Sequence, residues 1–443
     1  MGTHVVPCCR GISTKKTVLI TCFEDPVTLN LKIVGLGNGS RYERINDINL
    51  SPHYLASLKS HLHGLFQSPR NPSQNVKMPS GDAIPTGPVR LLVIAGGPSA
   101  EHTVSMMSAR NVLGAISGSK TISATLLVLT RQGRWLSETQ SLKALAALEA
   151  SSGGTVRPAT PLSELGDVVF SLLDGWEGGA GAIQGLMELE GIPYLGGGII
   201  STVLTRDKIV AKQILAAHGI PVCRYIAFTR EDYVENADKI IKQASEFSLP
   251  LFVKPANLGS ALGVSMVKDL SELEDAMQVA MDLDRRVLIE EGVKKPRELE
   301  VAIMGNYTLY PSPVGEIDYY GEWNNYETKY HTPPHYIIPA DIPKDISDKI
   351  TAYALQAYRL LDCTGYGRID FFMDRETQQI YFNEASCSPG FTAKSVYPQL
   401  MAGAGHSLLQ LIEHLIKFAL ERHPKKEEPV LRGQDEDEDG IVA

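Results

Sequence analysis

Several features are scarce in this sequence or missing from it. Its six cysteines show neither a C-x-x-C pair nor the histidine spacing of a zinc site, which disfavours a disulfide framework or a zinc module and fits reduced thiols in a cytosolic protein. No apolar run reaches transmembrane length, and the N-terminus has no secretory h-region followed by a cleavage site. No G-x-G-x-x-G follows a predicted strand, and this disfavours a dinucleotide-dependent oxidoreductase.

Basic residues are also fewer than acidic ones, 42 against 51. The formal net charge of −9 argues against a nucleic-acid partner, so an anionic ligand would need local lysines and arginines, helix N-termini or a metal ion. The length of 443 residues predicts two or three domains. Residues 1–85 differ from the rest and end in a Pro-, Ser- and Asn-rich linker, and we assign them no function. The acidic tail after His423 is predicted to be disordered.

The first predicted folded unit begins with the apolar run VRLLVIA at 89–95, which predicts a buried parallel strand. A tight GGPS turn and a helix at 99–116 follow, and open α/β folds place ligands at such junctions. Glu101, in the first helical turn, is either an acid of a ligand site or a residue favoured by the helix dipole. Two more strands are predicted, at 123–130 and 167–173. A Gly-rich loop at 174–181 and a helix at 183–189 follow them. This alternation predicts a parallel sheet of about four or five strands.

A second unit starts with a helix predicted over 201–218, which contains Asp207 and Lys208. Lys254 ends a predicted strand and leads into the small-residue loop KPANLGSALGVS. Backbone N–H groups and one lysine are what a polyphosphate requires, so this loop is interpreted as a flap over phosphates. It matches no established phosphate-loop spacing, and a flexible surface turn remains the alternative.

Two further segments supply candidate ligand contacts. The strand predicted at 286–291 ends in two acids, and Glu290, Val293 and Glu298 are interpreted as adenine and ribose contacts. The alternative for Glu290 is a solvated strand end. The aromatic, poorly periodic segment 317–333 is too long for a tight turn and is interpreted as a closing loop, with Lys329 and Tyr330 as its contacts.

The stretch 365–392 organises the rest of the chain. Two β-rich runs flank a polar turn and predict a hairpin, with Asp370 in the first run and Glu384 ending the second. Two carboxylates beside Arg368 suit Mg²⁺ bridging nucleotide phosphates. Gly390, in a Ser-Pro-Gly loop, has no side chain and can bring its N–H close to an oxyanion. The alternative is a surface hairpin with ordinary charges.

Taken in order, these segments resemble the ATP-grasp superfamily and, within it, the D-alanine–D-alanine ligases, over residues 89 to about 422. The most specific matches are GGPSAEHTVSMMSARNV, KPANLGSALGVS, and GRIDFF with SPGFT. The resemblance implies an α/β fold (α+β ATP-grasp), in which an N-terminal parallel-sheet domain precedes two ATP-grasp subdomains. The implied segments are an extension at 1–85, a substrate domain at 86–200, a central subdomain at 201–270, a catalytic domain at 271–423 and the tail at 424–443.

The resemblance also implies a reaction and its residues. ATP phosphorylates a first D-alanine, and the amine of a second attacks the acylphosphate, with Mg²⁺ (or Mn²⁺) as cofactor, a homodimer as the assembly, and no nucleic-acid or membrane partner. The implied ATP contacts are Lys208, Lys254, Glu290, Val293, Glu298 and Lys329. The implied metal ligands are Asp370, Glu384 and Ser386. The implied catalytic residues are Glu101, Ser260, Arg368 and Gly390. The implied substrate contacts are Glu101, Asp174, Tyr330, Ser388, Ser395 and Val396.

The chain departs from the family pattern at three places. The usual Asn two residues after the second acid is Ser386, and the second serine of the flap is Ala261. In the family's H-G-x-x-G-E-D-G loop, Asp174 replaces His, and Gly-Ala replaces Glu-Asp at 179–180. Asp174 adds a negative charge to the wall that contacts the first substrate. Two alternatives follow: a dipeptide ligase of altered amino-acid specificity, and a nucleotide-binding protein with degraded catalysis.

Overall fold

The computed structural model describes residues 88–150, 152–175, 178, 180–318 and 335–423, and four short strands nearer the N-terminus. The chain divides into two compact units, 1–71 and 72–443. In the first unit, the two-residue strands form two antiparallel pairs, β1 (His4–Val5) with β2 (Leu19–Ile20) and β3 (Val34–Gly35) with β4 (Glu43–Arg44).

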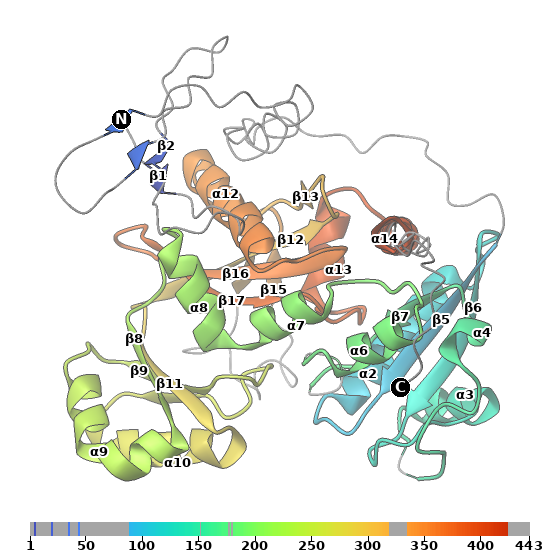
Figure 1. Cartoon of the computed structure of the whole chain (residues 1–443), viewed down its shortest axis with the longest axis horizontal. Helices are drawn as coiled ribbons and strands as arrows, with labels where there is room; N and C mark the ends of the chain where they lie inside the picture. Colours follow the sequence, from blue (N-terminus) through green and yellow to red (C-terminus); the bar gives the residue numbers. More distant parts are fainter. Residues whose placement is uncertain are drawn as a thin grey trace, which may run out of the picture. The chain divides into compact units, whose positions relative to one another are not determined.

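The second unit opens with a parallel sheet in which β5 lies between β6 and β7 (Figure 1). Its strands are β5 (Val89–Gly96), β6 (Ile122–Leu129) and β7 (Val168–Ser171). Its helices are α2 (His102–Ile116), α3 (Glu138–Ala147), α4 (Leu162–Leu165) and α6 (Ala182–Leu189). The prediction of four or five strands was wrong for the described residues. Segment 191–198 adds only a parallel bridge between Val169 and Tyr194, because left-handed Gly191 and Gly196 end the extended run on both sides.

An antiparallel sheet follows, with the strand order β10-β9-β11-β8. Its strands are β8 (Tyr225–Thr229), β9 (Leu251–Pro255), β10 (Ser265–Val267) and β11 (Arg286–Glu291). Its helices are α9 (Arg230–Ser245), the 3-10 turn η1 (Leu270–Glu272) and α10 (Leu273–Leu283). One apolar cluster joins α9 and α10 to β9 and β11, and it includes Ile240, Met277, Val253 and Ile289.

A larger antiparallel sheet has the order β15-β14-β12-β16-β17, with β13 paired to β12. Its strands are β12 (Pro296–Met304), β13 (Tyr310–Pro311), β14 (Gly315–Asp318), β15 (His335–Ile337), β16 (Tyr366–Asp374) and β17 (Ile380–Ser386). Its helices are α12 (Lys344–Leu360), α13 (Val396–Gly403) and α14 (Leu408–Arg422). The predicted hairpin is β16–β17, and Asp370 pairs directly with Glu384.

The helix predicted over 201–218 is two helices, α7 (Ile199–Arg206) and α8 (Lys208–Ala217). Asp207 separates them with extended backbone angles, φ −84° and ψ 101°. Its carboxylate accepts the backbone N–H groups of Ile209 and Val210 at 3.1 and 3.0 Å, which is an N-cap. The break starts a new helix at Lys208 and therefore fixes where that lysine points.

The apolar stripe of α14 was interpreted as core or dimer packing, and it lies in the core. Leu411, Ile412, Leu415 and Ile416 are buried with residues of β5 and α2. Three cysteines of the described part, Cys223, Cys363 and Cys387, are buried and unpaired. In the described residues we find no helix with the length and apolarity needed to cross a membrane.

Candidate functional site

A cavity of about 800 Å³ is walled by β9 and β11 of one antiparallel sheet and by β12, β16 and β17 of the other. Apolar walls are provided by Phe252, Val264, Met266, Val293, Ile317 and Phe372. Cationic side chains come from Lys208, Lys254, Lys268, Lys294, Lys295 and Arg375. A concave site with apolar walls and a few convergent charges suits a ligand that carries both a flat apolar group and anionic groups.

Lys254 belongs to a buried chain of charges. Its Nζ lies 2.5 Å from Glu290, and the Nζ of Lys212, on α8, lies 2.6 Å from the other oxygen of Glu290. Lys212 has no exposed surface and also donates to the carbonyl of Phe382 at 3.2 Å. Burial alone would raise the pKa of Glu290, but the two lysines outweigh it and lower that pKa to about 2. The carboxylate is thus ionised and occupied by two lysines.

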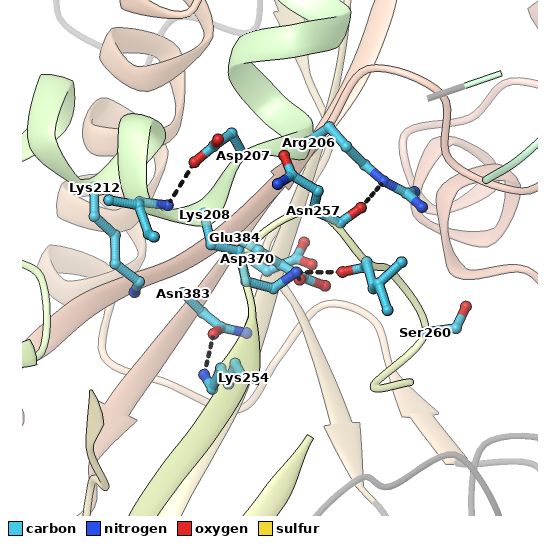
Figure 2. Close-up of polar contacts among 12 residues, drawn as sticks. Arg206, Asp207, Lys208, Lys212, Lys254, Asn257, Ser260, Asp370, Asn383 and Glu384 are labelled. Atoms are coloured by element: carbon cyan, nitrogen blue, oxygen red, sulfur yellow. Dashed lines mark hydrogen bonds and ion pairs between the residues drawn. The ribbon is translucent and has the colours of Figure 1, made fainter. Parts of the chain in front are cut away.

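Lys208 is the second buried lysine of the cavity. Its Nζ donates to the carbonyl of Leu258 in the flap at 2.5 Å and lies 3.6 Å from Glu384. Burial lowers its pKa, and Glu384 opposes that shift. Figure 2 shows Lys208 beside Glu384, and Lys254 directed toward Asn383, which precedes Glu384 on β17. Two lysines that start on different elements therefore meet at one end of the cavity.

The hairpin brings the acids and an arginine together. Arg368 holds Asp370 with two hydrogen bonds, at 2.7 and 2.6 Å, and its Nε lies 3.2 Å from Glu300. A register shift follows Asp370, so Asn383 is an extra residue on β17 beside Glu384. Such a bulge redirects side chains, and both residues line the cavity. The bulge explains how two consecutive strand residues face the same space.

The oxygen atoms at this end are of the kind that a hard divalent cation prefers. Asp370 and Glu384 stand opposite each other, and Ser386 follows two residues later on the same side of β17. No group of three or more His, Cys, Asp or Glu side chains suited to a metal ion occurs in the described ranges. Two carboxylates and a hydroxyl fit Mg²⁺ when ligand oxygens complete its shell, which is the usual arrangement for this ion.

A second cluster lies where the flap meets the parallel-sheet region. Ser260 donates its hydroxyl to the carboxylate of Glu101, which is 8% exposed. Arg206 donates to the carbonyl of Asn257 at 2.6 Å and to Asp174 at 3.3 Å (Figure 2 shows the first of these contacts). Burial, and next the charge of Asp174, raise the pKa of Glu101 to about 7. This end therefore carries two acids and one guanidinium.

A small cavity of about 20 Å³ adjoins this cluster, and Asp174, Ser388 and Gly390 line it. A Cβ on Gly390 would lie 3.0 Å from the hydroxyl of Ser395, so a side chain at this position would crowd the loop. The loop that follows β17 thus closes on the segment that follows β7.

Two family models match the chain: the D-ala D-ala ligase N-terminus over residues 90–197 and the D-ala D-ala ligase C-terminus over residues 214–417. The chain belongs to the D-alanine–D-alanine ligase family. It is therefore a ligase, and its fold is the α/β ATP-grasp fold expected from the sequence.

Full-length relatives agree with this assignment. The chain is 43% identical to the D-alanine–D-alanine ligase of Deinococcus radiodurans over 337 residues, which cover 75% of this chain and 98% of the relative. It is 38% identical to the enzyme of the same name from Acetivibrio thermocellus, with 75% of this chain and 96% of the relative covered. Among solved structures, the VanG D-Ala:D-Ser ligase from Enterococcus faecalis superposes with a TM-score of 0.63 at 29% identity, covering 75% of this chain and 99% of that one.

The structure places the predicted residues of this family member in two groups. The cavity is lined by Lys208, Lys254, Glu290, Val293, Glu298 and Glu384. The cluster near the flap contains Glu101, Asp174, Ser260, Ser388 and Gly390. The interpretation of Glu290 as a solvated strand end was wrong, because it is 2% exposed between two lysines. Ser395 stands at the N-cap position of α13 without a side-chain cap bond, Val396 is buried in the core, and neither lines a described cavity. Lys329 and Tyr330 lie outside the described residues.

Sequence reasoning missed Arg206, Lys212 and Asn383. Lys212 lies four residues after Lys208, so the helical repeat places both lysines on one face of α8. That spacing was a usable signal. The contact between Arg206 and Asp174 had no such signal, because it joins segments 32 residues apart through the fold.

Proposed function

We propose that the protein is a D-alanine–D-alanine ligase, or a close relative that joins two D-amino acids, and that it uses ATP. One observation carries the proposal. The 800 Å³ cavity has apolar walls and two buried lysines, and its polar end reaches the acidic hairpin that holds Asp370 and Glu384. ATP needs an apolar slot for adenine and cations for its phosphates, and both are present in one cavity.

Lys208 and Lys254 would bind the phosphates, with Val293 and Glu298 beside the adenine and ribose. Glu290 has a supporting role in this proposal, because both of its oxygens are engaged by lysines. It would hold Lys254 in the orientation that a phosphate requires. Lys329 remains proposed as a nucleotide contact, and Tyr330 as a substrate contact, of the closing segment.

Asp370, Glu384 and Ser386 would hold Mg²⁺, with Mn²⁺ as the alternative ion, and the ion would neutralise phosphate oxygens during transfer. Arg368 holds the carboxylate of Asp370 in place through its two hydrogen bonds. A serine hydroxyl replaces the amide oxygen of the family pattern at the third position, so we expect a weaker but functional metal site.

In the proposed reaction, a carboxylate oxygen of the first amino acid bonds to the γ-phosphorus of ATP, and ADP leaves. The amine of the second amino acid then attacks the acyl carbon, loses a proton, and phosphate leaves. Glu101 would bind the ammonium group of the first substrate, with Ser260 fixing the carboxylate. Arg368 and the N–H of Gly390 would stabilise the oxyanion, and Ser388, which lines the small cavity, would contact the second substrate. Ser395 and Val396 stay predictions as contacts of that substrate, although neither lines a described cavity.

Phosphate release from ATP tests this proposal, measured with Mg²⁺ across D- and L-amino acids, singly and in pairs. Release with D-alanine alone assigns the D-alanine–D-alanine reaction. Release only with another amino acid or pair assigns the alternative, a ligase of altered specificity, which the charge of Asp174 favours. A Lys254→Met variant, purified identically, controls for contaminating ATPases. ATP binding without any amino-acid-dependent release would favour degraded catalysis and overturn the proposal.

We also propose the domain boundaries stated above at 85, 200 and 423. The separate sheet β5–β7 supports the boundaries at 85 and 200. The boundary at 270 falls inside the second sheet, because β11 (Arg286–Glu291) pairs with β8 and β9, so we move it to the segment between β11 and β12. We propose a homodimer, supported by exposed apolar side chains that gather on α6 and α7. Three buried cysteines without partners support a cytoplasmic location.

A further inference from the structure

Arg206 occupies a position between the flap and the first-substrate acids. It ends α7, and its Nε donates to the carbonyl of Asn257 in the flap at 2.6 Å. Its NH1 lies 3.3 Å from Asp174, and the two side chains are 16% and 29% exposed. A Cβ on Gly259 would lie 3.2 Å from the same NH1, so the guanidinium packs directly under the flap backbone. The side chain of Arg206 thus connects the flap, at Asn257, to the first-substrate acid Asp174.

The flap is held in an unusual conformation at the same place. Ser260 and Ala261 both adopt left-handed backbone angles, with φ of 54° and 56°, which residues other than glycine rarely adopt. Such a conformation persists only where neighbouring contacts enforce it. The described contacts that do so are the bond from Ser260 to Glu101, the bond from Arg206 to Asn257, and the bond from Asn257 to Asp284 at 2.8 Å.

The charges of Glu101, Asp174 and Arg206 partly offset one another. Glu101 and Asp174 are two neighbouring acids, and the charge of Asp174 adds to burial in raising the pKa of Glu101. Arg206 opposes this effect, because its positive charge lowers the pKa of Glu101. When both carboxylates are ionised, they and the guanidinium leave a net charge of about −1, which a single substrate ammonium group would offset. Asp174 stands where the family pattern has histidine, so its charge requires compensation that a neutral residue would not.

We propose that Arg206 is a positioning and specificity-determining residue: paired with Asp174, it holds the flap over the first-substrate site and restricts that site to amino acids with one ammonium group and an uncharged side chain. This inference rests on the proposed function, since it concerns the same site. Without Arg206, the two acids face each other uncompensated and the site accepts a second positive charge.

The test uses the full chain and three variants, Arg206→Met, Asp174→Asn and the double variant, with Arg285→Met as an exposed-arginine control. We compare kcat/KM for D-alanine and for D-2,3-diaminopropionate as the first amino acid. In Arg206→Met the preference for the diamino acid over D-alanine should rise roughly tenfold, because a buried charge has lost its partner. The double variant should return to the preference of the unmodified protein, and the control should not change it.

The pH dependence of kcat/KM is a second test, and a purely structural role of Arg206 would not change it. With the pKa of Glu101 at about 7, kcat/KM for D-alanine should rise with pH through that value as the carboxylate ionises. This limb should move to higher pH in Arg206→Met, which removes the compensating charge, and to lower pH in Asp174→Asn, which removes the repelling one. Shifts in the same direction, or none, would overturn the inference.

Hydrogen exchange of the ligand-free proteins separates this inference from the proposed function. Amides at 257–264 should exchange faster in Arg206→Met and in the double variant, but not in Asp174→Asn, because Arg206 donates to the flap carbonyl of Asn257 and Asp174 bonds to Arg206 instead. Unchanged exchange in Arg206→Met refutes the inference even if the protein is an active ligase. Faster exchange, in a protein that releases no phosphate with any amino acid, supports the link between Arg206 and the flap while the proposed reaction fails.

Discussion

A single buried carboxylate, Glu290, carries much of the charge balance at the phosphate end of the cavity. It lies between Lys212 and Lys254, and the three groups together keep one net positive charge. In Lys212→Met the carboxylate would neutralise Lys254 completely. We expect the free energy of unfolding in urea to fall by about 3 kcal/mol, because a buried ion has lost a partner. We expect the KM for ATP to rise roughly tenfold.

The exposed Lys239 on α9 provides the matched control, since Lys239→Met removes the same charge from a solvated position. Equal urea midpoints for the two variants would show that the buried lysine contributes nothing. The pH dependence of the free energy of unfolding is a third test. The pKa of Glu290 is depressed to about 2, so the stability that it contributes is present above the unfolded value of about 4.3 and is lost as pH falls toward 2.

Metal affinity is a second property decided by single residues. Glu384→Gln should weaken Mg²⁺ binding at least about tenfold, because a carboxylate becomes a neutral amide. Ser386→Asn restores the amide oxygen of the family pattern and should strengthen binding several-fold. Mg²⁺ titration of fluorescent-nucleotide binding measures both effects without catalysis. Glu376→Gln, in the exposed turn of the hairpin, is the control. Identical Mg²⁺ midpoints for all variants would remove these residues from the metal site.

At the scale of elements, the boundary between α7 and α8 positions Lys208. Asp207 caps α8 and pairs with Arg286 of β11. Asp207→Ala should lower stability by about 1 kcal/mol through the cap alone and raise the KM for ATP, because Lys208 begins the same helix. Asp207→Asn keeps the cap and should retain most of the stability. Ser137→Ala, which removes the cap of α3, should cost similar stability with no change in KM. A KM effect as large in Ser137→Ala would contradict the link.

The same elements show what could be predicted from the sequence. The strand at 286–291 and the hairpin at 366–386 were located because apolar runs and turn residues are local signals. The break at Asp207 was missed because the helical spacing of apolar residues continues through it. The cap that starts a new helix there involves only Asp207 and the next three residues, so it leaves a weak signal in the sequence. The burial of Glu290 was missed for a different reason. Its lysines lie 78 and 36 residues earlier in the chain, and only the fold brings them together.

At the scale of the whole molecule, the exposed apolar side chains of α6 and α7 require an explanation. Leu189 at the end of α6 is 88% exposed, and on α7 Ile199, Ile200 and Val203 are 42%, 61% and 45% exposed. Exposed apolar side chains that recur along one helix suggest an interaction site, and a second copy of the chain is the partner that the family resemblance implies. Because a two-fold interface presents the same patch twice, one charged substitution places two like charges in it.

Ile200→Glu should therefore convert the proposed dimer to a monomer in light scattering at micromolar concentration, with the fold retained by circular dichroism. Val234→Glu, on the exposed face of α9, introduces the same charge at a position that is 80% exposed and should leave the dimer intact. A monomeric unmodified protein would refute the proposed homodimer, and a dimer that survives Ile200→Glu would place its interface elsewhere. Since α7 leads directly into Asp207 and Lys208, an interface on this helix would restrain the segment that orients both Arg206 and the phosphate lysine. The monomeric variant should then show faster hydrogen exchange at the start of α8 and a higher KM for ATP than Val234→Glu.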